Sequence, residues 1–124
     1  MGCASTATET PSAFPALDAT AQARRYRAMQ AALEHSPNGQ AARWVENERV
    51  YGRVVPIETM RTALYGWCRD YEELISMSAE NHRLVGIACR TSDGQWLVVD
   101  IRSYRELPSR NAGERPSSWS ETSR

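Results

Sequence analysis

The stretch that decides the fold is CRDYEELISMSAENHRLVGIACR, residues 68–90, which holds two of the chain's three cysteines, each followed directly by an arginine. Its first half has a helical pattern, because Tyr71, Leu74 and Ile75 fall at i, i+3 and i+4. The glutamates between them also favour a helix. If residues 68–77 are a helix, the spacing of the two cysteines has no structural meaning.

The same residues can also form a β-hairpin. Strands at 68–77 and 82–90, joined around SAEN (78–81), would bring Cys68 and Cys89 nearly opposite each other. Neighbouring strands come close enough for a disulfide, and closing this loop would stabilise the fold by about 3 kcal/mol. The alternative is a pair of reduced, buried cysteines in a cytosolic protein. The residues alone leave both possibilities open.

The composition limits the chain to one small domain with tails. It has 124 residues, of which 41% are hydrophobic, and its 15 basic and 15 acidic residues cancel. This balance gives no electrostatic argument for binding nucleic acid or an anionic membrane surface. No apolar run approaches the roughly 20 residues that a transmembrane helix needs.

The flanking sequence predicts one helix followed by strands. Asp18 can cap a helix over about 18–35, with an apolar stripe and an end at SPNG (36–39). The stripe consists of Ala19, Ala23, Tyr26, Met29 and Leu33.

After Gly39 the β-forming segments are QAARWV (40–45), RVYGRVVPI (49–57), HRLVGIACR (82–90) and QWLVVDI (95–101). Gly52 and Pro56 within the second segment indicate a bulged or edge strand. Asp93-Gly94 predicts the turn between the last two. Residues 1–17 have the composition of a linker. Residues 107–124, which include Trp119, have the composition of a disordered tail. The expected domain is therefore 18–106.

Several blocks of this sequence resemble the C-terminal domain of the bacterial 17 kDa outer-membrane surface antigen family. The blocks are GQAARW, YGRVVPI, CRDY and GIACRTSDGQW, and the resemblance covers about residues 28–99. The matching positions are Gly39, Gln40, Trp44, Gly52, Val54, Pro56, Cys68, Arg69, Tyr71, Gly86, Ala88, Cys89, Arg90, Asp93, Gly94 and Trp96. The chain departs from the family in its polar SMSAENH segment, in Ile87, and in the glycine-zipper segment, which is absent here.

The resemblance implies an α+β fold, with one N-terminal helix packed on a small antiparallel sheet of four to five strands. It implies a strand at 68–77 in place of the local helical pattern, and a disulfide between Cys68 and Cys89 on adjacent strands. It further implies an exported lipoprotein of the outer membrane, lipid-anchored on the periplasmic or the cell-surface side.

The sequence MGCAS at the N-terminus fits this implied localisation. Gly2-Cys3-Ala4-Ser5 looks like the end of a lipobox, with Cys3 as the lipidated residue, although no apolar segment precedes it as in a signal peptide. A trimmed mature end or a misplaced start codon would account for that. Two other interpretations stay open: an N-myristoylation pattern that runs from Met1-Gly2 to Thr6, and a plain free cysteine.

The sequence gives little support for catalysis, and we expect no catalytic, cofactor-binding or metal-binding residues. The two histidines are His35, at the expected helix end, and His82, which we expect in a solvated hairpin loop. In a strand, Asp70 and Glu72 share one face, which we expect to be solvated, and Glu73 lies on the other, with Tyr71 and Ile75 turned inward. No metal-binding or phosphate-binding motif is present.

Arg69 and Arg90 are the candidate binding residues. In a hairpin they point to the face opposite the cysteines, where Trp44 or Trp96 could stack on a guanidinium. This face is expected to be either a structural ladder or an exposed recognition surface for an envelope protein or peptidoglycan.

The sequence therefore predicts a non-enzymatic outer-membrane lipoprotein domain with an envelope-structural or partner-binding role, with no nucleic acid or small-molecule substrate as partner. The alternative is a small secreted inhibitor or immunity-type module that binds an enzyme through a hairpin loop at 76–83.

Overall fold

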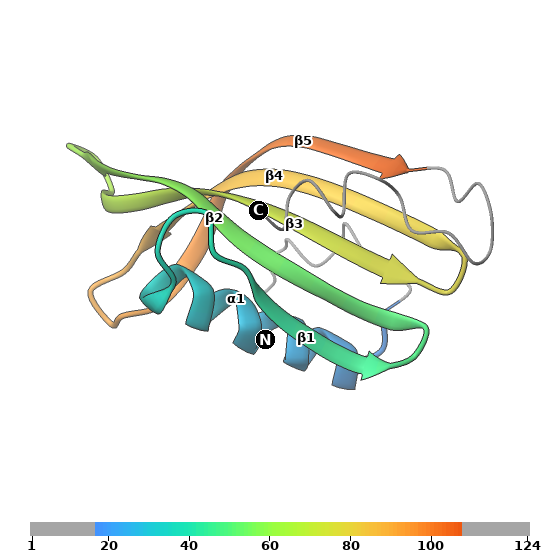
Figure 1. The fold of residues 1–124 in the computed structure, drawn as a ribbon. Coiled ribbons are helices and arrows are strands. Elements are labelled where there is room, and N and C mark those ends of the chain that lie inside the picture. The colour runs from blue at the N-terminus through green and yellow to red at the C-terminus, as the bar shows by residue number, and fades with distance from the viewer. Residues whose placement is uncertain (1–16, 108–124) are drawn as a thin grey trace, which may run out of the picture.

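A computed structural model describes residues 17–107 and confirms the α+β fold. One helix packs on a five-stranded antiparallel sheet in which each strand pairs with its neighbours in chain order (Figure 1). The elements are α1 (Ala19–His35), β1 (Ala42–Asn47), β2 (Val50–Thr62), β3 (Gly66–Met77), β4 (Glu80–Arg90) and β5 (Trp96–Leu107). The expected N-terminal linker, apart from Leu17, and the expected tail, apart from Leu107, lie outside the described residues.

The segment with the helical pattern is strand β3, as the resemblance implied. It pairs with β2 along one edge and with β4 along the other. Residues 71–77 are all buried, those on the face that the helix covers and those on the opposite face alike. A strand buried on both faces loses the alternation of apolar and polar residues that marks a half-exposed strand. This explains why the local pattern pointed to the wrong element.

The helix begins where the sequence placed it, but it buries a different face. Asp18 caps it, and its carboxylate accepts a hydrogen bond from the Ala21 backbone N–H at 2.8 Å. Of the predicted stripe only Met29 and Leu33 are buried, whereas Tyr26 is 46% exposed. The buried face consists of Ala21, Arg25, Met29, Ala32 and Leu33.

An arginine lies on the buried face because a buried carboxylate meets it. Glu73 of β3 is fully buried and accepts two hydrogen bonds from Arg25, at 2.6 Å from Nε and 3.0 Å from Nη2. Burial acts to lower the pKa of Arg25, but the charge and hydrogen bonds of Glu73 outweigh it and raise that pKa overall. The sequence placed Glu73 on the face opposite to Asp70 and Glu72, and that face is the one that the helix covers. Glu72, which was expected to be solvated, is only 7% exposed.

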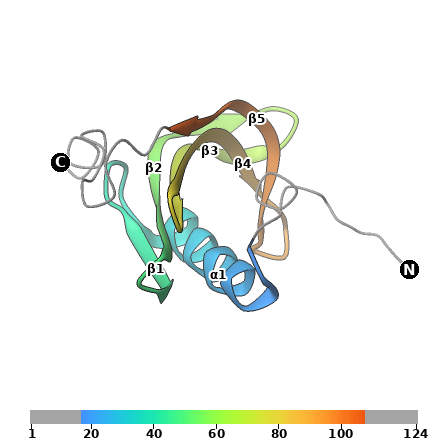
Figure 2. The ribbon, with the colours of Figure 1, turned by 90° about the vertical axis from the view of Figure 1, so that its right-hand side faces the viewer.

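The sheet arches over α1, so that its concave face and the helix enclose the core (Figure 2). The helix contributes Met29, Ala32 and Leu33. The sheet contributes Trp44, Val54, Tyr71, Ile75, Leu84, Ala88 and Trp96.

Strand β2 accommodates both of its unusual residues. Pro56 lies next to a shift in the pairing register between Pro56 and Glu58, which confirms the predicted bulge, although β2 is an interior strand. Gly52 lies directly opposite Trp44, and a Cβ atom at position 52 would come within 2.8 Å of the indole Nε1. The missing side chain lets the Trp44 ring lie close against the β2 backbone.

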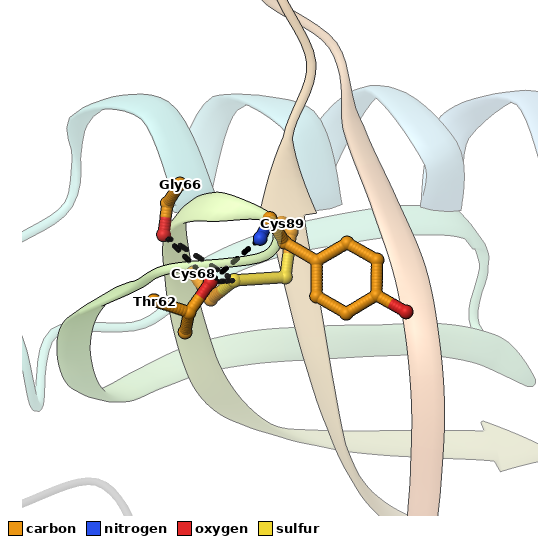
Figure 3. The surroundings of a disulfide bond; sticks show 5 residues. Thr62, Gly66, Cys68 and Cys89 are labelled. Carbon is orange, nitrogen blue, oxygen red and sulfur yellow. Dashed lines mark hydrogen bonds between the residues drawn. A yellow bond between two sulfur atoms is a disulfide. The ribbon is translucent and has the colours of Figure 1, made fainter.

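The disulfide between Cys68 and Cys89 links β3 and β4, as the resemblance implied (Figure 3). The two residues are direct partners in the strand register, with Cα atoms 3.9 Å apart. Cys68 is 1% exposed and Cys89 is 5% exposed. Nearby, the Thr62 hydroxyl donates a hydrogen bond to the Gly66 carbonyl and holds the β2–β3 turn beside the disulfide.

Candidate functional site

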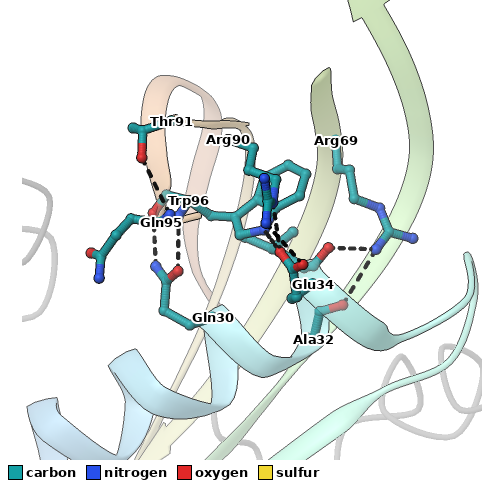
Figure 4. Close-up of polar contacts among 9 residues, drawn as sticks. Gln30, Ala32, Glu34, Arg69, Arg90, Thr91, Gln95 and Trp96 are labelled. Atoms are coloured by element: carbon teal, nitrogen blue, oxygen red, sulfur yellow. Dashed lines mark hydrogen bonds and ion pairs between the residues drawn. The ribbon is translucent and has the colours of Figure 1, made fainter. Parts of the chain in front are cut away.

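The two arginines that follow the cysteines both reach the C-terminal end of α1 (Figure 4). Side chains alternate between the faces of a strand, so residues next to a cross-strand disulfide point the opposite way. That opposite face is the concave one, which α1 covers. The sequence correctly predicted that the arginines and the cysteines point to opposite faces of the sheet. The face with the arginines was expected to be exposed, but the helix covers it at Arg69.

Arg69 is 7% exposed and binds the end of the helix. Its Nη1 donates to the carbonyls of Leu33 at 2.8 Å and Ala32 at 3.3 Å. Its remaining N–H groups donate to the Ser36 carbonyl and the Asn38 side chain, both at 2.8 Å, and to the Thr59 hydroxyl at 2.9 Å. The last carbonyls of a helix lack partners within it and carry partial negative charge, which a guanidinium satisfies.

Replacement of Arg69 by lysine should destabilise the protein although the charge is kept. An ammonium cannot reproduce the planar fork that reaches five acceptors, so some acceptors at the helix end lose their partner. We expect the free energy of unfolding to fall by about 1–3 kcal/mol in urea titrations followed by circular dichroism. Arg105→Lys, at an exposed position of β5, is the matched control and should change stability by less than about 0.5 kcal/mol. Equal stability of the two variants would contradict the capping role.

Arg90 and Trp96 bind the same end of the helix, through Glu34. Arg90 donates from Nε and Nη2 to the two Glu34 oxygens at 2.9 and 3.2 Å. The Trp96 indole donates to Glu34 Oε1 at 2.8 Å. Gln30 completes the contact, since its side-chain amide donates to the Trp96 carbonyl and its oxygen accepts from the Trp96 N–H.

These contacts make the stability of the protein depend on pH. The hydrogen bonds from Arg90 and then from Trp96 lower the pKa of Glu34 from 4.5 to about 2. A lowered pKa in the folded state means that the carboxylate contributes stability above its unfolded pKa. That contribution is lost as the pH falls from about 4.5 towards 2.

Glu34→Gln should therefore be less stable than the wild type near neutral pH, and the difference should shrink below about pH 4. Urea titrations of both proteins at a series of pH values measure this. Glu58→Gln, which changes an exposed carboxylate without an ion pair among residues 17–107, should show no such convergence. A difference between wild type and Glu34→Gln that does not vary with pH would refute the role of ionised Glu34.

An open groove of about 390 Å³ lies beside these contacts. It is lined by Leu33, Glu34, Thr59, Trp67, Arg69, Arg90 and Trp96. Three of the four candidate binding residues thus meet in one place. However, Arg69 and Trp96 are buried and hold the helix, so they present little surface, while Arg90 is exposed but paired with Glu34.

The exposed part of this region is the β2–β3 hairpin, which extends beyond the body of the sheet (Figure 1). Leu64 is 79% exposed, Tyr65 53% and Trp67 49%. The Arg61 guanidinium lies 5.3 Å from the centre of the Trp67 ring, within the range of a cation–π contact. This hairpin tip was not among the predicted sites, although YGW (65–67) places two aromatic residues at a turn.

Trp44, the fourth candidate residue, lies elsewhere. It is 5% exposed and packs in the core on the β1 side of the helix. The interpretation of Arg69, Trp44 and Trp96 as an exposed recognition surface is therefore wrong. The helix covers the concave face of the sheet, and these side chains fill the space beneath it.

His82 and its hairpin also differ from expectation. His82 belongs to β4, is 4% exposed, and lies 2.7 Å from the Tyr104 hydroxyl and 3.2 Å from Glu80 Oε1. Only Ser78 and Ala79 separate β3 from β4. The segment 76–83 is thus nearly all strand with a two-residue turn, a shorter connection than the predicted hairpin loop.

Residues 17–107 contain no candidate metal-binding cluster and no candidate membrane-spanning helix. No three histidine, cysteine or acidic residues there are grouped so as to hold a metal ion. Within the same range, no helix has the length and apolar character to cross a bilayer. Cys3, the predicted lipidation site, lies outside the described residues.

Comparison with known proteins finds relatives named 17 kDa surface antigen. The proteins from Rickettsia conorii (strain ATCC VR-613 / Malish 7), Rickettsia prowazekii (strain Madrid E) and Rickettsia bellii (strain RML369-C) are 36, 35 and 33% identical to this chain. Each match covers 72 residues, which is 57% of this chain and 45% of the relative, so the match spans less than half of each relative. No protein-family model and no solved structure matches the chain. The resemblance that the sequence blocks indicated is confirmed.

Proposed function

Because this chain is related to the 17 kDa surface antigens over more than half of its length, we propose that it is the folded domain of a non-enzymatic surface antigen, anchored in the outer membrane as a lipoprotein. The domain would contribute to the structure of the cell envelope or bind a partner there. It would face either the periplasm or the cell surface.

The Cys68–Cys89 disulfide is the observation that supports an exported domain. Disulfides form and persist in oxidising compartments such as the periplasm and are rare in reducing cytosol. This disulfide joins two strands that pair along most of their length, so the two thiols would be held together in the folded chain and oxidise readily outside the cytosol.

The anchor in this proposal is Cys3. Each buried CH₂ group of an acyl chain contributes about 0.8 kcal/mol to membrane binding, and stable anchoring requires more than one chain. A multiply acylated Cys3 would hold the domain at the membrane through the segment that precedes α1. The same assignment accounts for all three cysteines, one lipidated and two paired.

A binding role in place of catalysis is supported by how the polar side chains are used. The charged groups that line the groove cap the helix or pair with one another, as Arg69, Arg90 and Glu34 show. The hairpin tip, in contrast, exposes Leu64, Tyr65 and Trp67. Exposed aromatic residues of this kind are typical of the centres of protein interfaces.

Intact-mass measurement on protein expressed from the full reading frame in a Gram-negative host tests the proposed export and lipid anchor. We expect a mass increase that corresponds to acyl chains and that Cys3→Ser abolishes, and a gain of two hydrogens when reductant is added under denaturing conditions. Protein that remains unacylated and fully reduced would contradict the proposal.

Photo-crosslinking in cells tests the binding role of the hairpin tip. A photoreactive residue in place of Leu64 should give crosslinked products in the envelope fraction. One in place of Leu97, which is 53% exposed on β5, is the matched control and should give few. Equal labelling from both positions would show that the tip has no specific contact.

A further inference from the structure

The groove between α1 and β1 has a different character from the one at the helix end. The two elements lie side by side, with β1 at an edge of the sheet (Figures 1 and 2). The groove has a volume of about 410 Å³. It is lined by Arg24, Arg27 and Ala28 from the helix and by Arg43, Trp44 and Val45 from the strand. We propose that it binds an extended, acidic segment of a partner protein, which adds to β1 as a sixth strand.

The lining residues show that the groove follows the strand edge. Arg43, Trp44 and Val45 are consecutive, and side chains alternate between the two faces of a strand. A groove confined to one face would be lined by every second residue. Because all three residues line the groove, it follows the backbone edge of β1. Within residues 17–107, the other edge of β1 pairs with β2.

The β1 edge is regular where the groove meets it. Its pairing with β2 runs without a shift from Ala42 to Val45, and the one irregularity follows between Val45 and Asn47. The opposite edge strand, β5, contains two shifts in its pairing with β4. Bulges disrupt the straight row of N–H and C=O groups that an added strand needs, so β1 is the better template of the two.

The charge of the groove selects an acidic partner. Arg24 forms an ion pair with Glu46 at 2.8 Å, whereas Arg27 and Arg43 form none among residues 17–107. Arg43 also lies directly opposite Arg53 in the strand register, and its charge adds to burial in lowering the pKa of Arg53. Like charges across a strand pair are unfavourable. The whole chain has no net charge, so this positive potential is local.

The groove also offers apolar contact. Val45 is 61% exposed and Ala28 lies across from it on the helix. An added strand presents alternate side chains to opposite faces, so its carboxylates can meet the arginines while its apolar residues meet Val45. A phosphate group would satisfy the arginines but would leave the strand edge and Val45 unused.

Fluorescence anisotropy with a defined peptide tests the proposal. The probe is a fluorescein-labelled, end-blocked octapeptide of alternating glutamate and valine, titrated with the full 124-residue chain. We expect saturable binding, and amide chemical-shift changes in β1 by nuclear magnetic resonance. Arg27→Glu/Arg43→Glu should weaken binding about 100-fold, or roughly tenfold for each charge-assisted contact. Arg105→Glu, on the opposite edge strand, is the matched control and should change affinity by less than about twofold.

Two further probes separate strand addition from simple charge attraction. The same peptide with alternate backbone nitrogens methylated keeps its charge but cannot pair as a strand, so we expect its binding to be lost. Equal binding of the methylated peptide, or no binding of the original one, would overturn the proposal. So would binding of phosphatidylglycerol vesicles that depends on Arg27 and Arg43 in the absence of peptide binding. The assay does not depend on Cys3, so its failure is distinct from a failure of the lipid-anchor proposal.

Discussion

Replacement of Glu73 by alanine is expected to lower the free energy of unfolding by about 3–5 kcal/mol, the largest effect of any single substitution considered for this protein. The variant removes the partner of Arg25, whose side chain is 5% exposed, and so leaves a guanidinium buried without its carboxylate. The cost is large because a charge in the interior is poorly solvated and must be paired. Urea unfolding followed by circular dichroism measures it.

Two control variants test whether the loss of stability comes from an unpaired buried charge. Glu46→Ala breaks the neighbouring pair with Arg24, whose side chain is 47% exposed, and should cost no more than about 1 kcal/mol. Arg25→Met/Glu73→Met removes both buried charges while it keeps side chains of similar length, and should recover most of the loss. If Glu73→Ala costs no more than Glu46→Ala, the Arg25–Glu73 pair does not hold the helix to the sheet.

Reduction of the Cys68–Cys89 disulfide is expected to lower the free energy of unfolding by about 3 kcal/mol. The disulfide closes a loop with a sequence separation of 21, and its removal increases the conformational freedom of the unfolded chain. Small domains have a net stability of about 5–15 kcal/mol, so the loss is a large fraction of the total. The reduced protein should stay folded, because the strand pairing on both sides of β3 does not depend on the sulfurs.

Urea titrations of the wild type with and without dithiothreitol measure this effect. Cys68→Ala/Cys89→Ala should match the reduced wild type and should itself be insensitive to reductant. Cys3→Ala should leave the stability of the oxidised protein unchanged. A wild-type protein whose unfolding is the same with and without reductant would show that the disulfide contributes nothing to the fold.

Much of the secondary structure followed from the sequence because its signals are local. Asp18 and the SPNG segment marked the ends of α1, and Asp93-Gly94 marked the last turn. The glycine and proline in β2 also indicated its bulge, since each has a fixed backbone requirement that nearby residues cannot change.

The candidate site was predicted less well. The alternation of side chains along β3 and β4 correctly separated the cysteines from Arg69 and Arg90, but it could not say which face the helix would cover. Arg69 therefore appeared to lie on a surface, although it caps the helix, and the pairing of Glu73 with Arg25 in the core was not predicted. Apart from Thr59, which is 10 positions from Arg69, the partners of these residues lie 31 to 48 positions away along the chain, beyond any local pattern.

By itself, the sequence determined that the chain has one helix and a set of strands, that Cys68 and Cys89 are able to pair, and that Arg69 and Arg90 lie on the face opposite to them. These properties depend on backbone preferences and on the two-residue period of a strand. The tertiary structure decided which face of the sheet is covered, because only the arch of the sheet over α1 brings helix carbonyls and Glu34 within reach of the two arginines. A charged side chain that is buried must be paired with or hydrogen-bonded to other groups, and at Arg69 these pairings stabilise the fold. Which side chains are buried depends on residues that are distant in the chain.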